Sequence, residues 1–242
     1  MDKLLSNTQT DFSDIRENYE KIRADIKQAM ADAGRTDAVK LMAVTKTVDA
    51  GRVNYAIDLG ADLLGENRVQ EFLDKRGSYK DAEVHFIGGL QTNKVKYIID
   101  KVSMIHSVDS VRLAQEISRR AAQHGIVMDI LAEVNIGGED TKGGISAGSV
   151  RDFCGEVLKL PNIRLRGLMT IPPPSCGEEV FAEMQSLFEG IKAEPPQNSS
   201  GENFLFDTLS MGMSGDYAAA IKYGSTIIRI GSGLFGYRKY TK

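Results

Sequence analysis

The sequence predicts an α/β protein whose parallel strands close into a single (β/α)8 TIM barrel, with an extra N-terminal helix. Three observations predict this fold. Short β-type runs alternate with helical stretches after residue 38, eight such runs can be counted, and 242 residues fit one barrel of roughly 250 residues. The alternation alone also allows a doubly wound open sheet, which stays the alternative.

The extra helix is expected over residues 10–33. Its apolar residues recur every three or four positions and so form one stripe along a helix: Phe12, Ile15, Tyr19, Ile22, Ile26 and Met30. The barrel is expected over residues 38–238, and the whole chain, 1–242, is expected to be one domain.

The strand candidates are short apolar runs rich in β-branched residues. They are residues 39–46, 61–66, 83–89, 102–108, 127–136, 163–170, 206–211 and 225–232. Helices are expected between them, over residues 50–59, 67–76, 92–100, 110–124, 146–159, 177–192 and 214–223. Ser110 (after Asp109), Ser146 and Ser214 are candidate N-caps, because a serine hydroxyl can accept from a free backbone N–H at a helix start.

Composition excludes several classes of function. The chain carries 30 Lys and Arg against 33 Asp and Glu, a net charge of −3, so no excess of basic residues suggests nucleic acid or an anionic membrane as a partner. No apolar run is long enough for a membrane span, and the first residues are polar and acidic, unlike a signal peptide. The two cysteines have no metal-ligand spacing. We therefore expect a cytoplasmic protein without a metal.

Lys46 is the first candidate for chemistry. It follows the apolar run at 41–44, so its side chain should enter the barrel mouth at the carboxyl ends of the strands. Partial desolvation there leaves some of the amine neutral, and the neutral amine attacks aldehydes. The plain alternative is a lysine that extends its ammonium group to solvent at a strand end.

Two glycine-rich loops make that alternative less favoured. Residues 212–216 (GMSGD) follow the seventh strand candidate, and residues 229–236 (RIGSGLFG) end the eighth. Barrels often bind phosphate with the loops after strands seven and eight, where glycines let backbone N–H groups approach an anion. Ser214 and Ser232 add hydroxyl groups. A lysine on the first strand that faces such a cradle favours a binding site over ordinary turn glycines and a strand-end lysine.

The sequence leaves the roles of three further residues open. Arg229, on the eighth strand, needs an acceptor in the mouth, which could be a pyridine nitrogen, a carboxylate or a carbonyl. His85 and His106 lie on strand candidates and could act as acids or bases, although a single strand histidine is more often structural.

Eight segments of the chain together resemble the pyridoxal phosphate homeostasis protein family. They run in order from residue 43 to residue 236: AVTKT (43–47), GENRVQE (65–71), HFIGGLQTNK (85–94), HSVDS (106–110), EVNIGGEDTKGG (133–144), LRGLMTIPP (165–173), LSMGMSGDYAAAI (209–221) and RIGSGLFG (229–236). The family's barrel is similar to the N-terminal domain of alanine racemase. Two residues depart from the usual pattern of the family. At Gly89 the family usually has a bulkier residue or proline, and at Gly215 alanine is common.

The resemblance implies a cofactor, pyridoxal 5′-phosphate (PLP), and a set of residues that bind it. Lys46 would form the Schiff base, Asn67 would line the pocket beside the ring, and Arg229 would face the pyridine nitrogen. The phosphate would be held by Ser214, Gly231 and Ser232, with Met213 packed beside their loop.

The resemblance also implies a function without established catalytic turnover. Such a protein holds reactive PLP, maintains its intracellular level and supplies it to apo-enzymes, and we expect it to be a monomer. Racemases of this class use a second domain that covers the site, and no segment here is expected to supply it. A PLP-dependent racemase or decarboxylase stays open, as does an aldolase in which Lys46 attacks a phosphorylated sugar.

Overall fold

The computed structural model describes residues 12–139, 143–173 and 176–236. In these ranges the sheet contains nine strands, all paired in parallel. They are β1 (Lys40–Val44), β2 (Leu63–Glu66), β3 (Glu83–Phe86), β4 (Met104–Val108), β5 (Met128–Asn135), β6 (Ile145–Ser146), β7 (Ile163–Thr170), β8 (Phe204–Ser210) and β9 (Ile227–Ile230).

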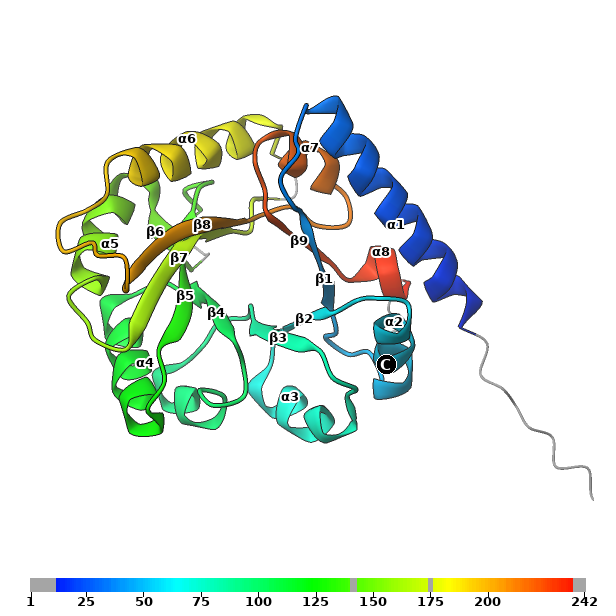
Figure 1. Ribbon diagram of the computed structural model, residues 1–242, viewed down its shortest axis with the longest axis horizontal. Coiled ribbons are helices and arrows are strands. Elements are labelled where there is room, and N and C mark those ends of the chain that lie inside the picture. Colours follow the sequence, from blue (N-terminus) through cyan, green and yellow to red (C-terminus); the bar gives the residue numbers. More distant parts are fainter. Residues whose placement is uncertain (1–11, 140–142, 174–175, 237–242) are drawn as a thin grey trace, which may run out of the picture.

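Eight of these strands close into a ring. The order β4-β3-β2-β1-β9-β8-β7-β5 is completed by pairing of β4 with β5, and the two-residue β6 pairs only with the last two residues of β5. Figure 1 shows the ring nearly end-on, with the helices outside it. Closure confirms the predicted barrel and excludes the open doubly wound sheet.

The helices cover the outside of the ring. They are α1 (Ser13–Asp32), α2 (Ala50–Asp58), α3 (Val69–Lys75), α4 (Val111–His124), α5 (Val150–Val157), α6 (Glu179–Ala193), α7 (Tyr217–Lys222) and α8 (Ser232–Phe235), with 3-10 turns η1 (Arg76–Ser78), η2 (Thr92–Tyr97) and η3 (Ala147–Ser149). Two large apolar clusters join the helices to the outer face of the strands. Two small clusters contain residues of strands and strand ends only, and these fill the ring itself.

The predicted N-terminal helix is present as α1, although residues 10 and 11 of the prediction lie outside the described residues, as do 237 and 238 of the predicted barrel. Helix α1 packs against α2, α7 and α8 on one side of the ring (Figure 1). Its Asn18 amide donates to the carbonyl of Leu234 at 3.1 Å, and Tyr217 donates to Asp25 at 2.7 Å. The beginning of the barrel domain is thus attached to its last helices.

The structure corrects several local predictions. Residues 92–97 form a 3-10 helix in place of the predicted α-helix over 92–100, and the helix expected from residue 146 begins at Val150 after β6 and η3. The last strand ends at Ile230 instead of residue 232, and the short helix α8 was not predicted. Each error lies in a short segment whose tertiary contacts override a weak local preference.

Only one of the three predicted N-caps forms. Ser110 caps α4, with its hydroxyl accepting from the N–H of Leu113 at 3.4 Å. Ser146 instead donates to the hydroxyl of Ser149. Ser214 lies before the start of α7, whose cap position is Asp216, and its hydroxyl bonds elsewhere. The Ser146 and Ser214 predictions were therefore wrong.

Cys154 and Cys176 are both free thiols. Within the described ranges, no helix has the length and hydropathy needed to cross a membrane, and no group of three His, Cys, Asp or Glu side chains could hold a metal ion.

Candidate functional site

A cavity of about 320 Å³ opens at the carboxyl ends of the strands, and we call it the strand-end cavity. Its lining combines apolar side chains with a small number of polar ones: Val44, Lys46, Asn67, Ile87, Ile171, Met213, Ser214, Gly215, Arg229, Gly231 and Ser232. All seven residues that the sequence analysis assigned to a cofactor line this one cavity. The structure therefore brings together residues from both ends of the barrel sequence.

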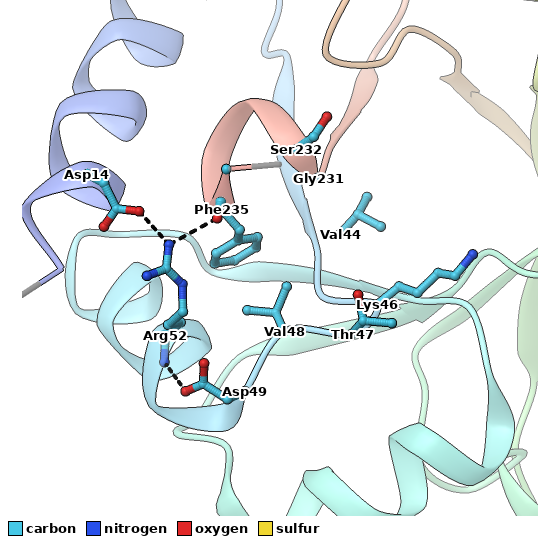
Figure 2. A pocket seen from close by; sticks show the side chains of 11 residues that line it. Asp14, Val44, Lys46, Thr47, Val48, Asp49, Arg52, Gly231, Ser232 and Phe235 are labelled. Atoms are coloured by element: carbon cyan, nitrogen blue, oxygen red, sulfur yellow. Dashed lines mark hydrogen bonds and ion pairs between the residues drawn. The ribbon is translucent and has the colours of Figure 1, made fainter. Parts of the chain in front are cut away.

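A second cavity of about 550 Å³, the side cavity, lies beside the first and shares Lys46 and Ser232 with it (Figure 2). Its outer wall is Arg52, whose guanidinium contacts Asp14 at 2.5 Å and the carbonyl of Phe235 at 3.0 Å. In Figure 2 the Lys46 side chain extends away from Arg52. The Lys46 amine is thus not tied to this ion pair.

The backbone around Lys46 is held on both sides. Thr45 is fully buried, and its hydroxyl donates to Glu66 at 2.8 Å. Thr47 has a positive φ of 63°, an uncommon conformation for a β-branched residue, and its N–H donates to Glu71. Lys46 itself is only half-buried. A fixed backbone with an accessible amine suits covalent attachment of a ligand.

The loop after β8 meets the short helix α8, which follows β9, at Ser214. The Ser214 hydroxyl accepts from the backbone N–H of Gly233 at 3.0 Å, and the Ser232 hydroxyl approaches it at 3.4 Å. A Cβ at position 233 would lie 3.1 Å from the Ser214 oxygen, so glycine lets the two segments come this close. Two hydroxyls and the backbone of a glycine-rich turn here face one part of the cavity, an arrangement suited to a phosphate.

Arg229 lies on β9 with only 4% of its surface exposed. Its guanidinium donates to the Ser210 hydroxyl at 2.8 Å and to the carbonyl of Thr170 at 2.7 Å. Burial lowers the pKa of Arg229 to about 10, while Glu133 and Asp216 oppose that shift. The side chain is therefore still a cation at neutral pH, held in a fixed orientation at the cavity wall.

Asn67 brings an unpaired polar atom to the strand-end cavity. Among the described residues, its buried Oδ1 has no hydrogen-bond partner. Its backbone is placed by Gly88, since a Cβ there would lie 2.1 Å from the Asn67 carbonyl oxygen. An unpaired buried amide is costly, so this atom is positioned for a group that the cavity receives.

The sequence analysis missed Glu133 on β5. Burial, with a smaller contribution from Asp109, raises the pKa of Glu133 to about 7, and Arg229 opposes the rise. The available signal was an acidic residue that interrupts the apolar run from Ile130 to Val134. Glu133 supplies a group near the barrel mouth that can take up or release a proton near neutral pH.

His85 and His106 lie inside the barrel behind Arg229, with ring nitrogens 2.9 Å apart. His106 also contacts the Ser210 hydroxyl at 3.1 Å. Neither histidine lines the strand-end cavity. The sequence prediction treated each strand histidine separately. It did not anticipate that the two rings would be in contact, because that contact depends on the register of β3 and β4.

Comparison with known proteins agrees with this geometry. The chain matches the family model described as alanine racemase, N-terminal domain, over residues 13–239. It is 43% identical over 231 residues to the pyridoxal phosphate homeostasis protein of Aquifex aeolicus, covering 93% of this chain and 98% of that protein.

Solved structures give the same result. The structure of PipY of Synechococcus elongatus with PLP bound superimposes with a TM-score of 0.77 at 28% identity, covering 92% of this chain and all of that chain. Alanine racemase from Corynebacterium glutamicum shares the fold at 15% identity, with a TM-score of 0.68 over 93% of this chain and 62% of its own. The chain belongs to the pyridoxal phosphate homeostasis protein family, whose barrel is that of the alanine racemase N-terminal domain.

Proposed function

We propose that this protein binds PLP in the strand-end cavity as a Schiff base with Lys46 and maintains the supply of the cofactor without catalytic turnover. One observation carries the proposal: Lys46 and the hydroxyls of Ser214 and Ser232 line the same cavity. The relatives named as PLP homeostasis proteins, and PipY with PLP bound, support it.

The lining fits the chemistry of the ligand. The Ser214 and Ser232 hydroxyls and the backbone at Gly231 would hold the phosphate, with Met213 beside them. The unpaired Asn67 amide would bond a polar substituent of the ring, and Arg229 would face the pyridine nitrogen. When bound, PLP supplies an aldehyde that condenses reversibly with an amine and a ring that can accept electrons.

The Lys46 amine attaches the ligand reversibly. Its nitrogen would condense with an aldehyde carbon with release of one water, and addition of water would restore both partners. The half-buried position of Lys46, between two cavities, leaves a path for that water. Reversible attachment is what a protein needs if it stores and releases an aldehyde.

Arg229 supports storage over amino-acid chemistry. Because the guanidinium has only N–H donors and keeps its charge, it would hold a facing pyridine nitrogen unprotonated. An unprotonated ring is a weaker electron acceptor, and electron acceptance is the main contribution of PLP to such reactions. We also propose that the working unit is a monomer that supplies apo-enzymes, because one chain provides every residue assigned here to the ligand.

The test is spectroscopic. The protein incubated with PLP should show a visible absorption band, borohydride should fix the ligand to the peptide that contains Lys46, and Lys46→Ala should lose both signals. If the protein takes up no PLP but borohydride traps a sugar phosphate on Lys46, the aldolase alternative replaces this proposal. Multiple turnovers of an amino acid that vanish in Lys46→Ala would make the protein an enzyme.

Supply to other enzymes needs a separate measurement. Mixing the loaded protein with an apo-enzyme should activate that enzyme faster than PLP dissociates spontaneously from the loaded protein. Equal rates would show release into solution without direct transfer. Light scattering measures the mass of the loaded protein in solution, which should be that of one chain.

A further inference from the structure

A row of four polar side chains crosses the barrel interior behind Arg229. Ser210 contacts Arg229 at 2.8 Å and His106 at 3.1 Å, His106 contacts His85 at 2.9 Å, and His85 contacts Glu83 at 2.9 Å. Ser210 and both histidines are at most 1% exposed, whereas Glu83 is 40% exposed at the other end of the barrel. The row therefore runs from the strand-end cavity to the opposite mouth.

That opposite mouth holds a cavity of its own, about 320 Å³ in volume, at the starts of the strands. Its titratable and charged lining residues are Asp37, Lys40, Glu83, His85, Asp129, Arg166 and Asp207. Most of these charges are paired: Lys40 with Glu83 at 3.5 Å, and Arg166 with Asp129 and Asp207 at 2.6 and 2.7 Å. We call it the strand-start cavity.

The two ends of the row fix the direction of its hydrogen bonds. Arg229 can only donate, and Glu83 can only accept, since the hydrogen bond from His85 holds the pKa of Glu83 down at about 2. Burial foremost, together with the nearby Arg229 cation, lowers the pKa of His106 well below its usual range. His106 is therefore a neutral ring with one N–H and one acceptor nitrogen.

With Arg229 as the donor at one end and Glu83 as the acceptor at the other, one arrangement of hydrogen bonds pairs every donor and acceptor of the row while both imidazoles stay neutral. Arg229 donates to the Ser210 oxygen, and the Ser210 hydroxyl donates to Nδ1 of His106. Nε2–H of His106 then donates to Nδ1 of His85, and Nε2–H of His85 donates to Glu83. Each donor has an acceptor and each acceptor has a donor, in one continuous direction.

The reverse direction is less favourable. If Nδ1–H of His106 donated to Ser210, then Nε2 would have to accept from His85, and His85 would need protons on both nitrogens. The Ser210 hydroxyl hydrogen would also lose the acceptor that His106 provides, at a fully buried position where an unpaired donor is costly.

We propose that Ser210, His106, His85 and Glu83 form a one-directional hydrogen-bond relay that positions Arg229 and couples the strand-start cavity to the cofactor site. Its link to the cofactor depends on the proposed function, but the relay itself does not. The four residues are positioning residues, because they act through Arg229. Committing the Ser210 hydrogen to His106 turns the oxygen lone pairs toward the guanidinium, which fixes the orientation of Arg229.

The first test uses the unmodified protein without ligand. Nitrogen-15 NMR of the imidazole rings distinguishes protonated from unprotonated Nδ1 and Nε2. Both His85 and His106 should carry hydrogen on Nε2 only, and the solvent-facing His124 at the end of α4 is the internal reference. A hydrogen on Nδ1 of His106 would overturn the proposal, whatever the protein binds.

The second test removes the charge of the acceptor at the exposed end of the relay. Glu83→Gln removes one negative charge from the strand-start cavity, and Asp207→Asn removes one from the same cavity outside the relay. The His106 ring signals should shift in Glu83→Gln and stay in place in Asp207→Asn. Equal shifts in the two variants would show a general charge effect and contradict the relay.

The third readout is the cofactor. Ser210→Ala should weaken PLP binding roughly 2- to 10-fold and shift the visible band, as expected for loss of one hydrogen bond that orients Arg229. Unchanged binding and spectrum would remove the positioning role. If the unmodified protein shows no visible band with PLP, the proposed function fails, while the NMR result still decides the relay.

Discussion

The hydroxyl of Ser214 accepts a hydrogen bond from the backbone N–H of Gly233, so that the loop after β8 is bonded to the short helix α8, which follows β9. The bond joins the two segments that the proposal assigns to the phosphate. A ligand anion there would meet a cradle whose parts already hold each other in place, which reduces the ordering cost of binding.

Ser214→Ala should therefore weaken PLP binding on the order of 10- to 100-fold, the usual effect of losing a hydrogen bond to a charged group. Equilibrium dialysis measures the dissociation constant. The matched control is Ser186→Ala on α6, an exposed serine that bonds only to its own helix at the Ala182 carbonyl. Equal affinities in the two variants would remove Ser214 from the site.

Gly88→Ala should disturb Asn67, because the added Cβ would lie 2.1 Å from the Asn67 carbonyl oxygen. Moving that backbone should cost about 1–3 kcal/mol of unfolding free energy and weaken PLP binding. Urea unfolding and dialysis measure the two effects. Gly89→Ala is the control, since nothing lies within 4 Å of its added Cβ, and equal losses in both variants would contradict the argument.

Arg229→Lys should destabilise the ligand-free protein by about 1–3 kcal/mol. An ammonium group cannot reproduce the two diverging bonds to Ser210 and Thr170, so at least one buried acceptor loses its donor. Urea unfolding measures the loss. Arg119→Lys, at an exposed position on α4, controls for the change of cation and should stay close to the unmodified protein.

Glu133→Gln should change how stability depends on pH. The pKa of Glu133 is about 7 in the folded protein against an ordinary value of 4.5, so the folded state binds the proton more tightly. The resulting stabilisation is fully present below about pH 4.5 and disappears as pH rises through about 7.

Between these pH values the unmodified protein should lose up to about 3 kcal/mol relative to Glu133→Gln, which cannot titrate. Urea unfolding of the ligand-free proteins at several pH values measures the difference. Glu183→Gln, at an exposed position on α6, should follow the unmodified protein. Parallel pH profiles for the unmodified protein and Glu133→Gln would show that Glu133 titrates normally.

The barrel was predictable from the sequence because the alternation of apolar strand runs and helical stretches recurs along the chain. Every strand of the ring overlaps a predicted strand, since a parallel strand buried on both faces reads as an apolar run. Residues 92–97 and 232–235 were not predicted correctly, because helices of four to six residues carry little periodic signal and form through their tertiary contacts.

The candidate site was predictable only in part. Lys46, Ser214 and Ser232 stand beside strand ends and glycine turns, which mark the open face of a barrel in the sequence itself. Glu133 and the contact between His85 and His106 were not predictable. They depend on which inward side chains reach the same level of the ring, and that is set by strand stagger on closure.

Strand β1, next to Lys46, pairs with β9, which carries Arg229 and leads to Ser232. The two halves of the proposed cofactor site thus come from opposite ends of the barrel sequence and meet where the ring closes. During synthesis, a ribosome must release almost the entire barrel before these residues can meet. The nascent chain would expose Lys46 without a phosphate cradle, so PLP can be captured specifically only after translation of the barrel is complete.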